Sequence, residues 1–207
     1  MTIVTNFFLA EVVTDRGGAA QILPDPIPIL EPGEPSDLGP GDHVFYVSSF
    51  DHDEPLELVI EVARQLGGDV TIHVSGDFTR ADPALVNTAP ANVAFLGFMN
   101  EDDYVTTMAS VDVVLTLTTQ EHTMQCGAYE AVALGQPLVF ANHEEMKRYF
   151  HKGVVVAELT VEDLTGAIRE ALARQDDLRR EMVGLKEDLI RSWSSDFKTV
   201  ERIIRRK

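Results

Sequence analysis

Short apolar runs alternate with amphipathic segments along the chain from His43 to about Ala173. Several of these runs are apolar at every position, which is typical of strands that are covered on both faces. Apolar residues recur at helical spacing in the segments between them. Strands that alternate with helices in this way predict right-handed crossovers and a doubly wound parallel sheet, so the expected fold class is α/β. The predicted strands are HVFYVS, DVTIHVSG, NVAFLGF, VDVVLTLT, PLVFAN and GVVVAE.

The ends of two intervening helices can also be predicted. After the first strand, Asp53 or Glu54 is expected to cap a helix that carries Pro55 in its first turn, where the missing N–H does no harm. A second helix is expected over residues 123–134, and Gly135 is its predicted C-terminal stop. Each of these helices follows a strand, so its first turn is expected at the carboxyl edge of the sheet.

The two ends of the chain differ from this alternating body. Residues 2–8 are predicted to be a strand, and residues 24–41 hold six of the ten prolines, which indicates an extended linker. Residues 176–191 and 196–206 are predicted to be two helices, with Trp193 packing the pair onto the body. The expected division is a lead-in segment and linker over 1–41, an α/β domain over 42–175 and a helical extension over 176–207.

Charge and composition exclude several classes of function. The net charge is −17, and residues 1–146 hold only three basic side chains against 23 acidic ones. Phosphate backbones require clustered lysine and arginine, so we expect no nucleic-acid partner. No apolar run reaches the length of about 18 residues that a membrane span needs. The single cysteine, Cys126, excludes an intrachain disulfide and fits a reducing compartment, so a cytoplasmic location is expected.

Candidate chemistry is expected in the loops that follow the strands. Ligands of a doubly wound sheet bind beyond the carboxyl ends of its strands. The predicted sheet places five loops there, namely Ser48–Glu54, Gly76–Asp82, Gly97–Glu101, Leu117–Thr123 and Asn142–Glu145.

One of these loops leads into the helix that starts near Thr123–Gln125. A helix start exposes unpaired N–H groups and a partial positive charge, which suit a phosphate or diphosphate. Glu121 and His122 precede this start and can reach groups beside a bound phosphate, and Glu130 can accept hydrogen bonds from ribose hydroxyls. The alternative interpretation is that Glu121 belongs to a helix cap, His122 is a loop residue and Glu130 is a surface carboxylate.

From about Asp42 to Ala173 the chain resembles the donor-binding half of a GT-B-fold glycosyltransferase, most closely family 4 (group 1). The stretches that carry the resemblance are NVAFLGFMNEDDYVTTMASVDVVLTLTTQEH and GAYEAVALGQPLV. The lead-in also resembles the end of an N-terminal domain and its crossover. The resemblance implies a Rossmann-like domain over 42–175 that binds a nucleotide-diphosphate sugar. It further implies sugar transfer to an acceptor, usually with retention and without a metal or other cofactor.

The resemblance also implies roles for individual residues. Glu121 or His122 would be catalytic and would contact the sugar hydroxyls, and Glu130 would bind the ribose. The diphosphate would lie at the helix start, and Gly97 and Phe98 would flank the base. The complete donor-binding set is Ser48, Ser49, Gly76, Gly97, Phe98, Thr123, Met124, Gln125 and Glu130.

Two departures from the family pattern concern this site. Eight residues separate Glu121 from Glu130, one more than separate the two glutamates of the family motif, so His122 occupies the register of the first. Either Glu121 reaches the site through an extra loop residue, or His122 takes its place. The family also places an arginine and a lysine after the first strand to hold the diphosphate, whereas this chain reads SSFDHDEPLE.

The nearest cations in the sequence are Arg80, Lys147 and Arg148. The acidic cluster itself has two interpretations. Asp51 and Asp53 offer oxygen ligands that suit a divalent metal, but helix capping with a solvated acidic edge is simpler, and no metal site is expected.

Only about 40 residues precede the donor-type domain, which leaves no room for an acceptor-binding half. We therefore expect a piece of a larger enzyme or a naturally shortened protein, which binds donor weakly and transfers little by itself. The missing acceptor-binding domain, or a partner protein, would complete it. The alternative hypothesis is a non-catalytic interaction module that keeps the fold and has lost the nucleotide-sugar chemistry.

Overall fold

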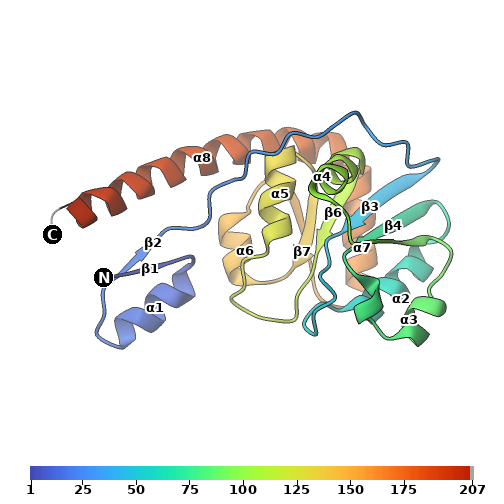
Figure 1. Cartoon of the computed structure of the whole chain (residues 1–207), viewed down its shortest axis with the longest axis horizontal. Helices are drawn as coiled ribbons and strands as arrows, with labels where there is room; N and C mark the ends of the chain where they lie inside the picture. The colour runs from blue at the N-terminus through green and yellow to red at the C-terminus, as the bar shows by residue number, and fades with distance from the viewer. Residues whose placement is uncertain (206–207) are drawn as a thin grey trace.

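Six parallel strands form the centre of the protein, in the order β5-β4-β3-β6-β7-β8. The structure is a computed structural model that describes residues 1–205 (Figure 1). The α/β fold class with a doubly wound parallel sheet is therefore confirmed. The sheet strands are β3 Asp42–Tyr46, β4 Val70–Ser75, β5 Val93–Gly97, β6 Val113–Thr116, β7 Leu138–Ala141 and β8 Val154–Ala157.

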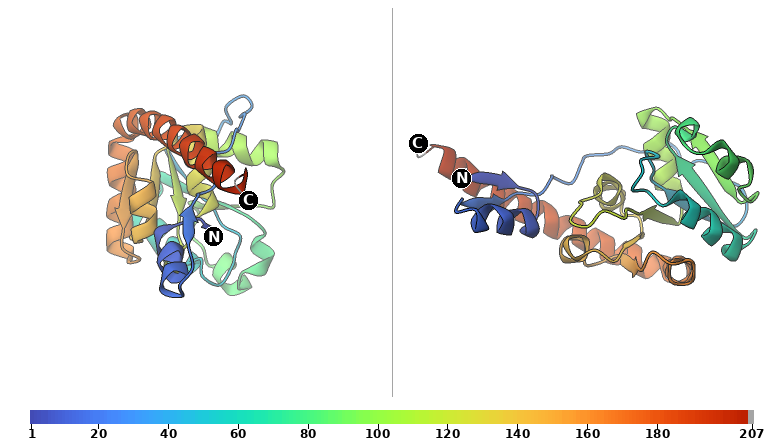
Figure 2. Two further views of the ribbon diagram at one scale, coloured as in Figure 1. Left: turned by 90° about the vertical axis from the view of Figure 1, so that its left-hand side faces the viewer. Right: turned by 90° about the horizontal axis from the view of Figure 1, so that it is seen from below.

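Helices connect these strands and cover both faces of the sheet (Figures 1 and 2). Those helices, together with the two that follow β8, are α2 Leu56–Leu66, α3 Pro83–Asn87, α4 Glu101–Ser110, α5 Cys126–Leu134, α6 Glu144–Tyr149, α7 Val161–Ala173 and α8 Gln175–Arg205. The helix α3 was not predicted from the sequence.

Strand residues alternate between two apolar clusters, one on each face of the sheet. Val44 and Tyr46 pack with helices α2 and α7, whereas Phe45 between them packs with α4, α5 and α8. Successive side chains of a strand point to opposite faces, so both faces must be apolar to be buried. This alternation explains why the strand sequences are apolar throughout.

The strand order reverses direction beside β3. From β3 the chain proceeds through α2 to β4 and then to β5, and it returns through α4 to β6 on the other side of β3. β3 and β6 are neighbours in the sheet, and the helices that follow them, α2 and α5, lie on opposite faces of it. Such a switch point leaves a crevice at the carboxyl edge of a parallel sheet, where ligands of this architecture bind.

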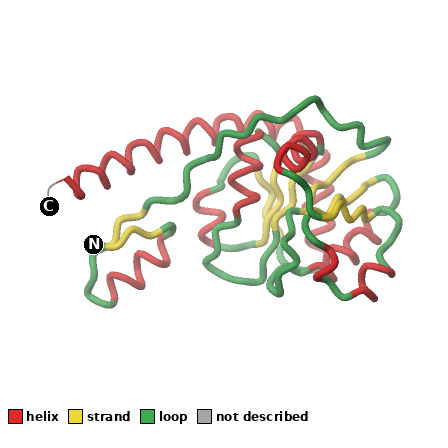
Figure 3. Tube along the Cα trace, in the orientation of Figure 1, coloured by secondary structure: helices red, strands yellow, loops and turns green. Residues whose placement is uncertain are grey.

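The proline-rich linker has neither helix nor strand from residue 23 to residue 41, as predicted (Figure 3). It nevertheless has fixed partners on the body. The amide of Gly33 donates to Oγ1 of Thr106 at 2.8 Å, and the amide of Ser36 donates to Oγ of Ser110 at 2.9 Å. Ile27 is buried among the residues of the α4, α5 and α8 face. The linker therefore lies across this face and not free in solvent.

The first 22 residues form a β-α-β unit, so the strand predicted over 2–8 is present only over residues 2–4 and a helix follows it. Strand β1 (Thr2–Val4) is followed by helix α1 (Phe7–Asp15) and strand β2 (Ala20–Ile22), which pairs with β1 in parallel. The strand ends early because the side chain of Asn6 accepts a hydrogen bond from the amide of Leu9 and caps α1.

The helical extension is one helix, α8, rather than the two predicted near 176–191 and 196–206. The serines around Trp193 do not break it, because serine in a helix costs far less than glycine or proline. Trp193 stacks on Phe197 with ring centroids 4.9 Å apart and donates from Nε1 to the carbonyl of Pro24 at 2.9 Å. Trp193 therefore fixes the linker to α8, at the end of the molecule where the β-α-β unit also lies (Figure 2).

None of the helices within residues 1–205 combines the length and apolarity that a membrane crossing requires.

Two buried histidines lie side by side in the sheet, and they predict a pH dependence of stability. Nδ1 of His43 is 3.1 Å from Nε2 of His73, and Nε2 of His43 is 3.1 Å from the carbonyl of Gly39. Burial, and then the charge of His43, lower the pKa of His73 below its ordinary value of 6.5. The folded state thus binds a proton less readily than the unfolded state, so stability is complete above pH 6.5 and falls as the pH drops below it.

We expect the melting temperature of His73→Gln to fall less than that of the wild type between pH 7 and pH 5. Thermal unfolding at each pH measures both. The exposed His151→Gln variant is the control and should follow the wild type. Parallel pH profiles for His73→Gln and the wild type would contradict this assignment.

Candidate functional site

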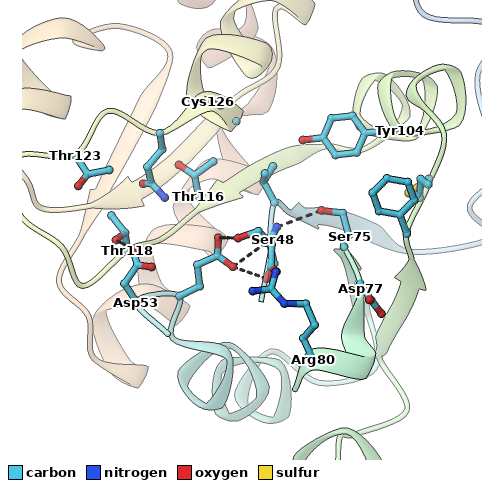
Figure 4. Close-up of a pocket in the computed structure, with 18 of the residues that line it drawn as sticks. Ser48, Asp53, Ser75, Asp77, Arg80, Tyr104, Thr116, Thr118, Thr123 and Cys126 are labelled. Atoms are coloured by element: carbon cyan, nitrogen blue, oxygen red, sulfur yellow. Dashed lines mark hydrogen bonds between the residues drawn. The ribbon is translucent and has the colours of Figure 1, made fainter. Parts of the chain in front are cut away.

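A cavity of about 560 Å³ opens at the carboxyl ends of β5, β4, β3 and β6, beside the switch point (Figure 4). Its walls come from the loops after these strands and from the start of α5. The lining residues are Val47, Ser48, Ser49, Asp53, Glu54, Ser75, Gly76, Asp77, Arg80, Phe98, Met99, Tyr104, Thr116, Thr118, Thr123, Met124, Gln125, Cys126 and Gly127.

The start of α5 is held against the sheet by a close contact at Gly127. A Cβ atom on Gly127 would lie 2.8 Å from Cγ2 of Thr116 and 2.8 Å from Cγ2 of Val47. Thr116 ends β6, and Val47 follows β3, so the helix begins directly over the crevice between these strands. Only glycine lets the helix backbone approach this closely.

The first turn of α5 has no side-chain cap. Its N-cap residue is Gln125, whose side chain makes no capping hydrogen bond within the described chain. The predicted start near Thr123 was therefore early, although Thr123, Met124 and Gln125 all line the cavity. The first amides of a helix lack intrahelical partners and carry a partial positive charge, so an anion in the cavity would be stabilised there.

Two buried polar atoms beside this helix start have no hydrogen-bond partner among the described residues. They are Oγ1 of Thr116, a side chain that is only 1% exposed, and Oε1 of Gln125. A buried polar group without a partner costs free energy, so such groups often mark where a ligand or a water binds. Neither atom was identified as unpaired from the sequence, because the absence of a partner is a property of the packed structure.

The loop between β3 and α2 differs from its predicted arrangement. Either Asp53 or Glu54 was expected to cap α2, but its N-cap is Pro55, and neither acidic side chain caps the helix. Glu54 instead turns back toward the end of β3. Its Oε2 accepts from Oγ of Ser48 at 2.7 Å and from the amide of Ser49 at 2.8 Å, and its Oε1 accepts from Oγ of Ser49 at 3.0 Å.

Asp53 joins this loop to the loop after β6. Its Oδ2 accepts a short hydrogen bond from Oγ1 of Thr118, and its carbonyl accepts from the amide of Thr119 at 2.8 Å. Oδ1 of the exposed Asp51 is bonded to Nδ1 of His52 at 2.8 Å. Possible ligand atoms of Asp51, His52 and Asp53 lie within 4.8 Å of one another, on the exposed edge of the loop.

A second glycine brings the loops after β3 and β4 together. Gly76 has a φ of +96°, and a Cβ atom there would lie 2.2 Å from the carbonyl oxygen of Ser48. The amide of Ser48 in turn donates to Oγ of Ser75 at 3.2 Å, as the dashed line in Figure 4 shows. Gly76 therefore lines the cavity for a steric reason: its backbone allows the two loops to meet.

Arg80 is the one lysine or arginine among the described residues that line the cavity. Its Nη1 donates to the carbonyl of Ser49 at 2.6 Å. The other two candidate cations are occupied elsewhere. Lys147 pairs with Glu144 at 2.5 Å, and the guanidinium of Arg148 lies 4.6 Å from the ring centroid of Phe7.

Glu121 and His122 lie outside the lining of the cavity in the described structure. His122 has a φ of 63°, and its ring stacks on Phe8 with centroids 3.6 Å apart. Nδ1 of His122 is 2.9 Å from Oε1 of Glu145, and Nε2 is 3.7 Å from Oε2 of Glu121. The two predicted catalytic residues are thus adjacent to each other, and His122 contacts the N-terminal β-α-β unit. Their contact with a sugar stays a prediction.

Glu130 does not line the cavity itself but contacts it through Tyr104. Its Oε2 accepts from the hydroxyl of Tyr104 at 2.7 Å, and Tyr104 lines the cavity. Burial, and then the charge of Glu130, raise the pKa of Tyr104, so the hydroxyl stays protonated and donates. Figure 4 shows this hydroxyl directed toward the start of α5. No pattern in the sequence pointed to Tyr104, which is one of several polar residues on α4.

Seven of the nine predicted donor-binding residues line the cavity, and Gly97 ends the strand directly before Phe98. Their roles toward a donor stay predictions. The seven are Ser48, Ser49, Gly76, Phe98, Thr123, Met124 and Gln125.

Residues 41–174, more than half of the chain, match the sequence model of the family "Glycosyl transferases group 1". The chain belongs to this family. The resemblance seen in the sequence is thereby confirmed. No curated protein sequence matches the chain.

Solved structures of glycosyltransferases share the fold at low sequence identity. Sucrose-phosphate synthase from Thermosynechococcus elongatus superposes with a TM-score of 0.78 at 18% identity, over 99% of this chain and 57% of that one. HepE from Anabaena, solved with UDP and glucose, gives a TM-score of 0.81 at 17% identity, over 99% of this chain and 63% of that one. The chain thus spans less than two thirds of the length of either protein.

The contact at Gly127 predicts that a single methyl group there is destabilising. We expect Gly127→Ala to lower the free energy of unfolding by about 1–3 kcal/mol, because overpacking forces the helix start away from β3 and β6. Gly166→Ala in α7 is the matched control, since a Cβ atom at Gly166 meets nothing within 4 Å. The control should be more stable by about 0.5–1 kcal/mol, as for glycine replaced by alanine inside a helix. Chemical denaturation measures both, and equal effects of the two substitutions would refute the contact.

Proposed function

We propose that the cavity binds a nucleotide-diphosphate sugar and that residues 42–175 are the donor-binding domain of a glycosyltransferase. The observation that carries this proposal is the buried, unpartnered hydroxyl of Thr116 beside the uncapped start of α5. The helix amides and this hydroxyl offer hydrogen-bond donors with no partner in the described chain. They lie at the switch point of a parallel sheet, where ligands of this architecture bind.

In this proposal the diphosphate lies against the first turn of α5. The amides of Cys126 and Gly127 and the hydroxyl of Thr116 donate to its oxygens, and the helix dipole favours its negative charge. The same groups stabilise the charge that develops on the leaving diphosphate as the sugar departs, which is the contribution expected to dominate such a transfer. The donors are fixed by packing, so they need little reorganisation.

The nucleoside then extends from α5 toward the end of β5. Phe98 is 89% exposed there and presents an aromatic face on which a base can stack. Glu130 and Tyr104 form a hydrogen-bonded pair beside the diphosphate position, and Glu130 keeps free acceptor positions for ribose hydroxyls. The sugar lies at the opposite end of the diphosphate, near the loop that carries Glu121 and His122.

Two of the similar structures guide the choice of nucleotide. HepE was solved once with UDP and glucose and once with UDP-glucose. UDP and UDP-sugars are therefore the first donors to test. Sugar transfer also requires an acceptor site, which we propose is formed with an acceptor-binding domain packed against the β-α-β unit.

The second candidate is a non-catalytic module that keeps the fold. One observation favours it: Glu54 places a carboxylate on the hydrogen-bond donors of Ser48 and Ser49, and Arg80 is the only cation among the described lining residues. The two candidates differ in whether the cavity binds nucleotide.

The role of Thr116 can be tested by removing its hydroxyl without changing its size. We expect Thr116→Val to weaken UDP binding about tenfold, measured by isothermal titration calorimetry, because a hydrogen bond to a charged group is lost. Folding should be unaffected or up to about 1 kcal/mol more favourable, since the hydroxyl has no protein partner in the described structure.

Thr165→Val is the matched control, because Oγ1 of Thr165 is also buried and unpartnered but lies on α7, away from the cavity. It should leave UDP binding unchanged. Equal binding by Thr116→Val and the wild type would remove the observation on which the proposal rests. If the wild type itself fails to bind UDP or any other nucleoside diphosphate, the non-catalytic module is favoured.

A further inference from the structure

The carboxylate of Glu54 occupies a group of converging donors inside the cavity. It receives three hydrogen bonds of 2.7–3.0 Å, from the hydroxyl of Ser48 and from both the amide and the hydroxyl of Ser49. Two hydroxyls and one main-chain amide that point at a single site form the kind of arrangement that also holds a phosphate oxygen. In this chain the carboxylate of Glu54 occupies the position that a phosphate oxygen would take.

The loop that presents these donors is fixed on several sides. Oγ of Ser48 also accepts from the amide of Phe50 at 3.0 Å, and Phe50 has a φ of 58°, in the left-handed region that is rarely adopted by a large side chain. Arg80 donates to the carbonyl of Ser49 at 2.6 Å. Backbone conformations of this kind persist where surrounding contacts determine them, and they occur frequently at functional sites.

The charges around Glu54 show what its presence does to the cavity. Asp53, Glu54 and Asp77 line the cavity together with Arg80. Asp53 is bonded to Thr118, and Asp77 is bonded to Thr79, whose hydroxyl and amide lower the pKa of Asp77. Glu54 is the carboxylate that occupies the converging donors of the loop after β3.

We propose that Glu54 is an internal competitor for the phosphate groups of the ligand, so that binding a nucleoside diphosphate requires displacement of its carboxylate from Ser48 and Ser49. This inference rests on the proposed function and adds a determinant of affinity to it. With Glu54 in place, the cavity offers a diphosphate only the α5 side. With Glu54 withdrawn, the donors of Ser48 and Ser49 become available on the β3 side, next to Arg80.

The consequence is a cavity that discriminates against highly charged ligands until Glu54 moves. A like charge beside a bound diphosphate is unfavourable, and hydrogen bonds to an ionised group are stronger than neutral ones. A change of a single side chain, without any change of fold, would therefore strengthen diphosphate binding.

Two substitutions at Glu54 test this proposal. Glu54→Ala removes both the charge and the occupant, and we expect it to bind UDP about tenfold more tightly than the wild type. Glu54→Gln keeps an oxygen that can accept from the amide of Ser49, so the loop is retained, but it removes the charge and should give a smaller gain. Glu57→Gln removes an equal charge from an exposed position in the first turn of α2 and should bind as the wild type does.

UDP binding is measured by calorimetry, and the amide of Ser49 is followed by ¹H–¹⁵N NMR during titration with inorganic phosphate. We expect the Ser49 amide to respond saturably to phosphate in Glu54→Ala but not in the wild type. If the Glu54 variants bind UDP no more tightly than the wild type and Glu57→Gln, Glu54 is not a competitor, and the proposed function stands without it.

If no variant binds UDP, the proposed function fails, and the phosphate titration decides the role of Glu54 separately. A Ser49 amide that responds to phosphate only after Glu54 is removed still supports the internal competitor. A Ser49 amide that responds in neither protein, or equally in both, overturns it. Should Glu54→Ala fail to fold, Glu54→Gln is compared with the wild type instead, with a smaller response expected at the Ser49 amide.

Discussion

The contact between Gly127 and the ends of β3 and β6 is the constraint on which the rest of the site depends. Because Gly127 has no Cβ, α5 begins within van der Waals reach of Val47 and Thr116. This brings the unpaired amides of a helix start to the bottom of the crevice at the switch point. If a larger residue stood there, the helix start would shift outward, away from Val47 and Thr116.

The other walls of the cavity follow from similar short contacts. Gly76 allows the loops after β3 and β4 to meet at Ser48, and the bonds of Asp53 to Thr118 and Thr119 tie the loop after β3 to the loop after β6. The result is a cavity with two unlike sides. On the α5 side the hydroxyl of Thr116 has no partner among residues 1–205, whereas the donors on the β3 side already hold the carboxylate of Glu54. Under the proposed function, this asymmetry would decide how tightly the cavity binds a diphosphate.

The sequence predicted the sheet well because burial on both faces leaves a strong apolar pattern. All six predicted strands are present, and Gly135 ends α5 in the left-handed conformation. Two helices were predicted where α8 is continuous through the serines beside Trp193, and the strand predicted over residues 2–8 missed the cap supplied by Asn6.

The site was predictable only in part. The loops that line the cavity could be identified, because chain topology determines which loops share the carboxyl edge. The direction in which each side chain points could not be predicted. Glu54 turns toward Ser49 because of the local backbone conformation, and His122 turns toward Phe8, which is distant in sequence. For the same reason, nothing in the sequence distinguished the unpaired hydroxyl of Thr116 from the paired hydroxyl of Thr118.

The central claim is that an anionic nucleotide is held by the first amides of α5. Titration of the ¹⁵N-labelled chain with UDP, followed by amide chemical shifts, tests it most directly. We predict saturable shifts at the amides of Cys126 and Gly127, while the amide of Gly166 in α7 stays unchanged. UDP that causes no saturable shift at Cys126 and Gly127, or shifts only amides away from the cavity, would contradict the account.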